Sequence, residues 1–541
     1  MKLVTVTEMI AIEQEADASG LTYDKMMENA GRNLAAVVAE MYSYLSGEGI
    51  LALVGKGNNG GDALVALTRL AQQGWKTTAY LVADRPSDDP LVDRLTEAGG
   101  QLIRAGLGTG HQSLVHEIGS TPLLLDGVLG TGIKLPLRGT AAEVLETVKG
   151  HLSKMDSPPI VVAVDCPSGV DCDTGETAPQ TLPAQLTITM AAAKVGLFNF
   201  PAADHAGRLR LVGIGPLDGL ESWGVATRTV TGEDSVRKIL PKRPRNAHKG
   251  TFGAVTVVAG STNYTGAALL AGKAAYRVGA GLVTLAVPGI VYRVLAGHFP
   301  EATWLLLPEE MGVIAANAAG LLDKNLERTT ALLLGPGFGL EDTTRDFVTN
   351  LLTPATGKSR PKIGFVKSTQ ESEDEKPKTE LPPIVVDADG LKLLAKIPDW
   401  PAKLPGDTVL TPHPGEMSAL TGLDKDEIQA DRLGAAERFA KEWGHVVVLK
   451  GAFTIVAAPD GRLTLIPVAT PALARAGTGD VLAGMIAGLR AQGVDAFDAA
   501  VAGAWLHAQA GRIAEYDLGS SAAVLAGDVL DAVVDAMGEI G

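Results

Sequence analysis

The chain has 541 residues, of which 46% are hydrophobic and 20% charged, so it is globular and long enough for two or more domains. Its formal net charge is −15 without a basic stripe to offset it, which argues against a nucleic-acid or acidic-membrane partner. No apolar run approaches the roughly 18 residues that a membrane-spanning helix needs. Cys166 and Cys172 are too few for a disulfide framework or a four-ligand zinc site. We therefore expect a soluble cytoplasmic protein.

The first half begins with apolar positions at helical spacing over residues 7–44, which Gly20 divides into two predicted helices. A predicted strand at residues 50–54 is followed by a glycine-rich loop at 55–62 and a helix from about Ala63. This order is typical of a dinucleotide-binding turn, although the glycine spacing is not G-x-G-x-x-G. The asparagines and aspartate of the loop could bind a hard cation together with phosphate or ribose.

Carboxylates follow two further predicted strands of the first half. Asp126 comes after residues 123–125, and Asp165 comes after residues 160–164. The last strands of this half are expected at residues 186–190 and 209–214, with Lys194 on the loop between them. A single aspartate in such a position is often only a helix cap. Three acidic or glycine-rich loops at the carboxyl edge of one parallel sheet favour a ligand site instead.

Five separated motifs of this half occur in order: MENAG at 27–31, GNNGGD at 57–62, the loop of Asp126, VDCPSG at 164–169 and TITMAAAKVG at 187–196. Together they resemble the NAD(P)H-hydrate epimerase domain over roughly residues 1–225. The resemblance implies potassium ligands at Asn59, Asp126 and Ser168, and acid–base chemistry at Asp165. It also implies a hydrate-binding site formed by Asn58, Asn59, Gly60, Gly61, Asp62, Gly130, Thr131, Gly132, Ile133, Lys134, Leu135, Pro136 and Asp165. The chain departs from the family at Ala63, where a further glycine is usual.

In the second half, strands alternate with helices. The periodic pattern fades over residues 215–236, so we place the start of a second domain near residue 230. Strands are then expected at residues 254–259, 282–287, 302–307, 331–334, 384–386, 408–410 and 446–449, with a hairpin formed by 453–457 and 463–466. This alternation predicts a mainly parallel sheet with helices on both faces. The charged, proline-containing stretch 358–383 is expected to be a mobile surface insertion.

The sequence Ala-Gly-Thr-Gly-Asp at residues 476–480 precedes an apolar helical run and indicates a phosphate site. The amides of Gly477, Thr478 and Gly479 would point at an anion ahead of the helix, where the helix dipole favours negative charge. Asp480 is a poor anion ligand but a suitable base for a hydroxyl that attacks a phosphoryl group. Alternatively, the segment is only a glycine-rich turn with an acidic residue in a favourable first-turn position.

A metal site at His413 is disfavoured, although a His-x-x-Glu spacing can suggest one. The neighbours Pro412 and Pro414 should prevent a regular helix at this position, and a third ligand is not evident.

Seven ordered motifs of the second half, HKG, YTGA, GPGFG, VVDADG, TPHPGE, LKGAFT and AGTGD, resemble the ADP-dependent NAD(P)H-hydrate dehydratases of the ribokinase-like group. With both halves, the chain is similar to bifunctional nicotinamide nucleotide repair proteins. The resemblance implies an α/β protein of two domains: a Rossmann-like three-layer sandwich at 1–225 and a ribokinase-like three-layer sandwich at 230–541. Nucleotide contacts would fall on Lys450, Gly451, Ala452, Phe453, Thr454, Gly477, Thr478 and Gly479, and substrate contacts on Ala267, Gly337, His413 and Asp480.

The implied substrate is NADH or NADPH that carries a hydroxyl on its reduced ring. The first domain would interconvert the R and S hydrates with K⁺. In the second, Asp480 would deprotonate the S hydrate while ADP, with Mg²⁺, donates its terminal phosphoryl group, and elimination would give NAD(P)H, AMP and phosphate. Besides these small molecules, we expect no nucleic-acid or membrane partner, and we expect the chain to form a homo-oligomer. A small-alcohol kinase and a non-catalytic nucleotide sensor remain as alternatives.

Overall fold

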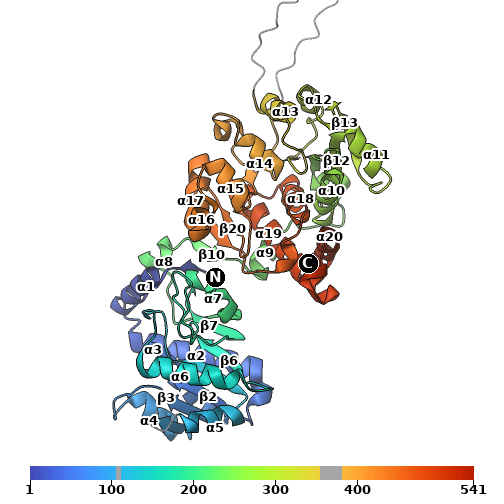
Figure 1. Cartoon of the computed structure of the whole chain (residues 1–541). Helices are drawn as coiled ribbons and strands as arrows, with labels where there is room; N and C mark the ends of the chain where they lie inside the picture. The colour runs from blue at the N-terminus through green and yellow to red at the C-terminus, as the bar shows by residue number, and fades with distance from the viewer. Residues whose placement is uncertain (105–110, 354–379, 541) are drawn as a thin grey trace, which may run out of the picture. The chain divides into compact units, whose positions relative to one another are not determined.

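The computed structural model describes residues 1–104, 111–353 and 380–540. Within it the chain divides into two compact units, Met1–Val230 and Thr231–Gly541 (Figure 1). The predicted insertion at 358–383 falls mostly outside the described residues. Each unit is organised around its own sheet.

Two helices open the first unit. The first, α1 (Val6–Ala18), is capped by Thr5, whose hydroxyl accepts from the Glu8 amide while the Glu8 carboxylate accepts from the Thr5 amide. Gly20, with φ of +95°, turns the chain into α2 (Tyr23–Tyr42). The predicted pair of helices with Gly20 between them is confirmed.

The central sheet of the first unit has seven parallel strands in the order β4-β3-β2-β5-β6-β7-β9. The strands are β2 (Ile50–Val54), β3 (Thr77–Leu81), β4 (Gln101–Arg104), β5 (Leu123–Gly127), β6 (Ile160–Val164), β7 (Leu186–Met190) and β9 (Arg208–Val212). Their order reverses between β2 and β5, which opens a crevice at the carboxyl edge of the sheet. A separate parallel pair joins β1 (Leu3–Val4) to β8 (Ala193–Lys194).

Helices cover both faces of this sheet. One apolar core joins it to α1, α2, α3 (Asn58–Gln72) and α4 (Pro90–Glu97), and a second core joins it to α5 (Gln112–Ser120) and α6 (Gly139–Leu152). The shorter α7 (Ala202–Ala206), α8 (Glu221–Val225) and β10 (Arg228–Val230) complete the unit. The Rossmann-like three-layer sandwich is therefore confirmed.

The predicted start of the helix after the glycine-rich loop is wrong by five residues. We expected a loop over 55–62 and a helix from about Ala63, but α3 begins at Asn58. A Cβ on Gly60 would lie 2.1 Å from the carbonyl oxygen of Gly55, so the first turn of the helix packs directly on the preceding loop. The glycines of this segment have no side chains, so α3 can pack closely against the loop that precedes it.

The sheet of the second unit runs β21-β20-β19-β18-β17-β16-β11-β12-β13. The strands from β19 to β13 are parallel, and β19-β20-β21 are joined as antiparallel neighbours, so the predicted hairpin is confirmed. The strands are β11 (Ala254–Val258), β12 (Leu282–Pro288), β13 (Thr303–Leu307), β16 (Ala331–Leu334), β17 (Ile384–Val386), β18 (Val409–Leu410), β19 (Val446–Leu449), β20 (Ile455–Ala457) and β21 (Leu463–Leu465); β14 (Glu309–Glu310) and β15 (Val313–Ile314) form a separate hairpin.

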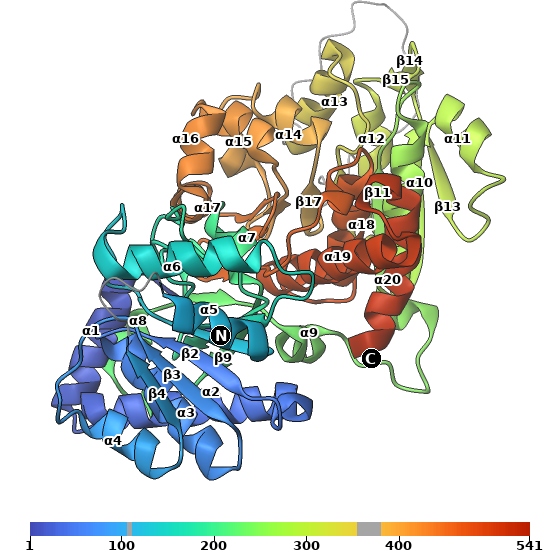
Figure 2. The ribbon, with the colours of Figure 1, turned by 60° about the horizontal axis from the view of Figure 1, so that its bottom comes forward.

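Two helical layers enclose this sheet (Figure 2). One face packs on α9 (Glu233–Ile239), α10 (Thr265–Arg277), α11 (Gly289–Leu295), α18 (Thr478–Ala491), α19 (Ala496–Leu518) and α20 (Ala526–Ile540). The other face packs on α12 (Ala318–Asp323), α13 (Asp342–Leu352), α14 (Asp389–Leu394), α15 (Pro414–Thr421), α16 (Lys425–Ala430) and α17 (Arg432–Trp443). The three-layer architecture predicted for the second half is confirmed. In the described ranges, no helix combines the length and the apolar character needed to cross a bilayer.

Candidate active sites

At the carboxyl edge of the first sheet, the three residues expected to bind potassium come together. Ser168, after β6, donates from its hydroxyl to Asp126 Oδ1 at 2.5 Å and from its amide to Asp126 Oδ2 at 2.8 Å. The same hydroxyl accepts from the Leu129 amide at 2.9 Å, and Asn59 Nδ2 donates to the Leu129 carbonyl at 2.9 Å. Side chains from α3, β5 and the loop after β6 thus meet around one backbone segment.

Asp126 is fully buried, and burial raises the pKa of its carboxyl although the hydrogen bonds from Ser168 oppose this effect. None of the ion pairs found in the described residues involves Asp126. A bound monovalent cation would stabilise the ionised form, and carboxylate, hydroxyl, amide and backbone oxygens are suitable donors for a hard ion. The residue types present therefore fit K⁺.

Asp165 lies in a constrained position one step after β6. Its φ of +62° is in the left-handed region, which a non-glycine residue rarely adopts. Its Oδ1 accepts from the amide of Met190 at 2.9 Å, from the hydroxyl of Thr189 at 3.1 Å and from the ammonium of Lys194. Such strain, held by several bonds, is typical of a functional residue.

The other residues expected at the first site divide into two groups. Asn59, Gly60, Gly61 and Asp62 are buried in the first turns of α3, whereas Asn58 is exposed. Gly130 lies against Asn59, because a Cβ on Gly130 would be 3.5 Å from the Asn59 side chain. The remaining residues, 131–136, form an exposed to half-buried loop between β5 and α6.

In the second unit, the segment at 476–480 forms the start of α18. Gly477 is the residue before the helix, with φ of +92°, and Thr478 is the first helical residue. The Thr478 hydroxyl donates to the carbonyls of Leu473 at 2.9 Å and Arg475 at 2.8 Å, and its amide donates to Arg475 at 3.4 Å. Thr478 therefore holds the loop in shape, which leaves the amides of Gly477 and Gly479 as the stronger candidates for contact with a phosphate.

Asp480 lies in the first turn of α18. Burial raises its pKa to about 7, and the negative charge of Asp387 adds to the shift while Lys450 opposes it. A carboxylate that titrates near neutral pH is well matched to the role of a general base.

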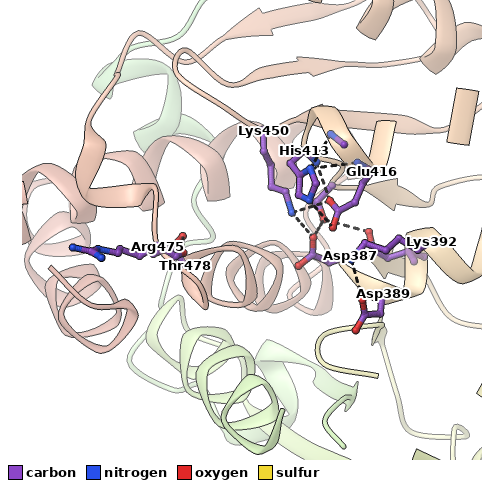
Figure 3. A network of polar contacts seen from close by, with 11 residues as sticks. Asp387, Asp389, Lys392, His413, Glu416, Lys450, Arg475 and Thr478 are labelled. Atoms are coloured by element: carbon purple, nitrogen blue, oxygen red, sulfur yellow. Dashed lines mark hydrogen bonds and ion pairs between the residues drawn. The ribbon is translucent and has the colours of Figure 1, made fainter. Parts of the chain in front are cut away.

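A buried ionic network lies beside this turn (Figure 3). Lys450 Nζ is 2.6 Å from Asp387 Oδ1 and 3.6 Å from Glu416 Oε2. Burial alone would lower the pKa of Lys450, but the carboxylates of Asp387 and Glu416 raise it above its usual value. A Cβ on Gly479 would lie 3.5 Å from Lys450 Nζ and 3.8 Å from Asp387 Oδ2, so the network directly borders the glycine-rich turn at 476–480.

His413 belongs to the same network. Its Nδ1 accepts from the amides of Gly415 at 2.9 Å and Glu416 at 3.3 Å, and its Nε2 lies 3.3 Å from Glu416 Oε1. Burial lowers the pKa of His413, with Glu416 opposing that shift. We expected no regular helix here, but α15 begins at Pro414 with His413 as its cap, because proline at the first helical position sacrifices no hydrogen bond.

The other residues predicted for the second site lie on two neighbouring features. Gly337 approaches the start of α10 closely, since a Cβ on it would lie 2.9 Å from the Cβ of Ala267. The segment 450–454 is held by Arg432, which donates to the carbonyls of Ala452 and, at 3.3 Å, of Leu449. Within it, Thr454 donates to the Gly451 carbonyl at 3.0 Å.

Three residues of these sites were absent from the predicted set. Asp387 and Glu416 occur in the motifs VVDADG and TPHPGE, and Lys194 occurs in TITMAAAKVG. Asp387 could have been found from the sequence because it directly follows a buried strand. Glu416 could have been found because it lies three residues after His413, which is the spacing of a capping box. No local signal identifies Lys194 as a partner of Asp165.

Fold and sites together define a two-domain α/β protein with converging oxygen-bearing side chains in one unit. In the other unit, a glycine-rich helix start lies beside a buried carboxylate and an ionic network. Residues 255–533 match the family model of NAD(P)H-hydrate dehydratase, and residues 23–196 match that of the YjeF-related protein N-terminus. The bifunctional NAD(P)H-hydrate repair enzyme of Moorella thermoacetica is 36% identical over 541 residues, covering 98% of this chain and 96% of that protein. The Escherichia coli enzyme of the same name is 33% identical, covering 92% and 87%. The chain belongs to the bifunctional NAD(P)H-hydrate repair enzyme family.

Among solved structures, the chain is similar over part of its length to the ADP/ATP-dependent NAD(P)H-hydrate dehydratase of Bacillus subtilis, which was co-crystallised with ATP and Mg²⁺. The two sequences are 31% identical, with a TM-score of 0.47, and the match covers 58% of this chain and 99% of the Bacillus chain.

Proposed function

We propose that the second unit dehydrates the S hydrate of NADH or NADPH with ADP as phosphoryl donor, and that the first unit interconverts the R and S hydrates. One observation carries the dehydratase assignment. Asp480, with a pKa of about 7, stands at the amino end of α18 beside the ionic network of Lys450 and Asp387. A base and an anion-binding turn are thus next to each other, as phosphoryl transfer to a hydroxyl requires.

The reaction follows from these positions. Asp480 takes the proton of the ring hydroxyl, and the oxygen attacks the terminal phosphorus of ADP, releasing AMP. The helix amino terminus with the amide of Gly479 stabilises the charge on the phosphoryl group during the transfer. Phosphate is a much better leaving group than hydroxide, so it departs, the neighbouring carbon loses a proton, and the ring double bond is restored.

The dehydratase would use Mg²⁺, whose chemical contribution is to neutralise charge on the phosphates. Asp387 and Glu416 are the residues that would hold it. Asp387 Oδ2 is buried and has no hydrogen-bond partner in the described part of the chain, so one carboxylate oxygen is available. No cluster of three His, Cys, Asp or Glu among the described residues could hold a metal alone, which fits an ion that arrives with the nucleotide.

For the epimerase we propose K⁺ bound by Asn59, Asp126 and Ser168. The convergence of these side chains on the Leu129 backbone and the complete burial of Asp126 support this proposal. The ion would fix the loops that follow β2, β5 and β6, and would thereby position Asp165. Homo-oligomeric assembly and a cytoplasmic location stay predictions from the sequence.

Product analysis tests the proposed function. Hydrated NADH should be incubated with ADP and Mg²⁺, and the return of the nicotinamide absorbance should be compared with the AMP and phosphate formed. We expect equal amounts of NADH, AMP and phosphate, and parallel reactions with ATP identify the preferred donor. A stable phosphate ester without recovered NADH would indicate a small-alcohol kinase instead, and binding without turnover would indicate a nucleotide sensor.

A further inference from the structure

The proposed function leaves a buried lysine of the first unit without a role. Lys194 lies in β8, which pairs in parallel with β1, so that Val4 stands opposite Lys194. The lysine side chain is only 1% exposed. A buried lysine is costly unless its charge is paired, so its partners are informative.

The ammonium of Lys194 has three partners at the carboxyl end of β7 and β6. It donates to Asp165 Oδ1, to the Thr189 hydroxyl at 3.2 Å and to the Met190 carbonyl at 3.1 Å. Burial alone would lower the pKa of Lys194, but the Asp165 carboxylate outweighs burial and raises it. Lys194 is therefore charged and uses all three of its hydrogens.

These bonds fix Asp165 on one side only. Lys194, the Met190 amide and the Thr189 hydroxyl all bind Oδ1 of Asp165, and none of them binds Oδ2. The Asp165 side chain is 14% exposed. Oδ2 is consequently oriented and left for a ligand, while the ammonium of Lys194 lies at Oδ1.

A second acidic group lies at the carboxyl edge of the same sheet, at the start of the helix that follows β2. Asp62, in the first turns of α3, is buried, and burial raises its pKa well above the usual value, with Asp165 and Glu13 adding to the shift and Lys194 opposing it. Glu13, from α1, also has a raised pKa because of burial. The hydrogen bonds that run from Asn59 through Leu129 to Ser168 join this end of α3 to the loop that carries Asp165.

We propose that Asp62 and Asp165 form the proton donor and acceptor pair of the epimerase, with Lys194 as the positioning residue of Asp165. The inference rests on the epimerase function proposed above. Hydration of an enamine places the hydroxyl on the carbon bonded to nitrogen, so inversion requires that this C–O bond break and form again.

The step balances without an added reactant. Asp62 gives its proton to the hydroxyl, which leaves as water with the electron pair of the C–O bond, while the lone pair of the ring nitrogen forms a C=N bond. Water then adds to the opposite face of the ring and gives a proton to Asp165 Oδ2. The reverse direction uses the two groups in exchanged roles. The starting state returns when Asp165 releases its proton to solvent and Asp62 takes one up.

The test follows the conversion of purified R hydrate into S hydrate by chromatography. No ADP or ATP is added, so the dehydration reaction cannot occur. Asp62→Asn should lower the epimerisation rate by at least about 10²-fold, the usual contribution of a general acid. Lys194→Met should shift the acid limb of the pH–rate profile to higher pH, by about one pH unit or more, because the Asp165 carboxylate loses its buried counter-charge. Lys194→Arg retains the charge and should keep that limb in place.

Arg69→Met is the matched control. Arg69 lies in the last turn of α3, at the opposite end from Asp62, and its charge is also paired, with Glu28 of α2. It should leave the pH–rate profile unchanged. A Lys194→Met profile that is reduced equally at every pH would make Lys194 merely structural, and a wild-type rate for Asp62→Asn would overturn the assignment of the donor. If the wild-type chain does not exceed the spontaneous rate, the epimerase function itself fails and not only this inference.

Discussion

Asp480 shows at the scale of one residue how burial changes the chemistry of a side chain. An aspartate in water is ionised far below neutral pH, yet here burial and the charge of Asp387 raise the pKa to about 7. The group can then accept a proton and release it again under physiological conditions. Lys450 limits the shift, because its ammonium favours the ionised form.

Replacing the base should separate catalysis from folding. Asp480→Asn keeps the shape of the turn and removes the proton acceptor, so we expect dehydration of the S hydrate to fall by about 10²-fold or more, with nucleotide binding nearly unchanged. Steady-state kinetics and nucleotide titration measure the two effects.

Because the folded-state pKa is raised above the usual 3.8, ionisation of Asp480 costs stability as pH rises from about 4 to about 7. The Tm of the variant at pH 8 should therefore equal or exceed that of the wild type, and turnover like the wild type would contradict the assignment.

The pH dependence of the dehydratase follows from the same group. Only ionised Asp480 accepts the proton, so kcat/KM for the S hydrate should fall as pH drops through about 7. Well below that value the decrease should approach tenfold per pH unit. Initial rates at saturating ADP between pH 5 and pH 9 check this. A profile that stays flat down to pH 5 would exclude Asp480 as the titrating base.

At the scale of elements, the packing of α18 on α10 fixes the position of the glycine-rich turn at 476–480. A Cβ on Gly484 of α18 would lie 2.1 Å from the Ala271 carbonyl oxygen of α10, and a Cβ on Gly488 would lie 2.7 Å from that of Ala275. Glycines one turn apart therefore let the two backbones touch. The amino end of α18, with Asp480, is held in place by the same contact.

Gly484→Ala should destabilise the second unit, because the added methyl group meets backbone that cannot move aside. We expect the free energy of unfolding to fall by about 1–3 kcal/mol or more, the usual cost of overpacking. Gly320→Ala is the control. Gly320 is exposed in α12 with no atom within 4 Å of the added Cβ, so alanine should be neutral or stabilising by up to about 1 kcal/mol. Chemical denaturation of both variants measures the difference. Equal free energies of unfolding for the two variants would mean that α10 and α18 can move apart at little cost.

At the scale of the whole molecule, the two proposed sites lie in two compact units, each with its own parallel strands and its own apolar cores. The proposed cation ligands and Asp165 belong to residues 1–230, and Asp480 with its ionic network belongs to residues 231–541. Each site therefore has its own scaffold. A substitution at one carboxyl edge should leave the chemistry of the other unit intact.

Asp126→Ala tests this division of labour. The variant loses a buried carboxylate that is proposed to bind K⁺, so epimerisation and its potassium dependence should disappear. Pure S hydrate should still be dehydrated with ADP at the wild-type rate. A mixture of epimers should be consumed quickly until the S hydrate is exhausted, and then at the rate of spontaneous epimerisation. Equal loss of activity on pure S hydrate, or a progress curve that runs to completion like the wild type, would refute separate sites.

The sequence by itself determined the order and type of most elements and the positions of the strand-end loops. Apolar runs of strand length, helical periodicity and glycine-rich turns are local signals, so strands such as Ile50–Val54 and Ala331–Leu334 could be predicted within a residue. The motifs around Asp126, Asp165 and Asp480 could be identified for the same reason. The strands Thr77–Leu81 and Gln101–Arg104 were missed.

Tertiary structure alone decided what these residues contact. Lys194 of β8 contacts Asp165, which lies 29 residues earlier in the sequence. Asp387 comes close to Gly479 because β17 and α18 meet across nearly a hundred residues of sequence. The early start of α3 depends on the close approach of Gly60 to Gly55, and the hydrophobic periodicity of the sequence contains no signal for such a contact. Burial, the charges of distant neighbours and close backbone contacts set the pKa values, and all three arise only when the chain is folded.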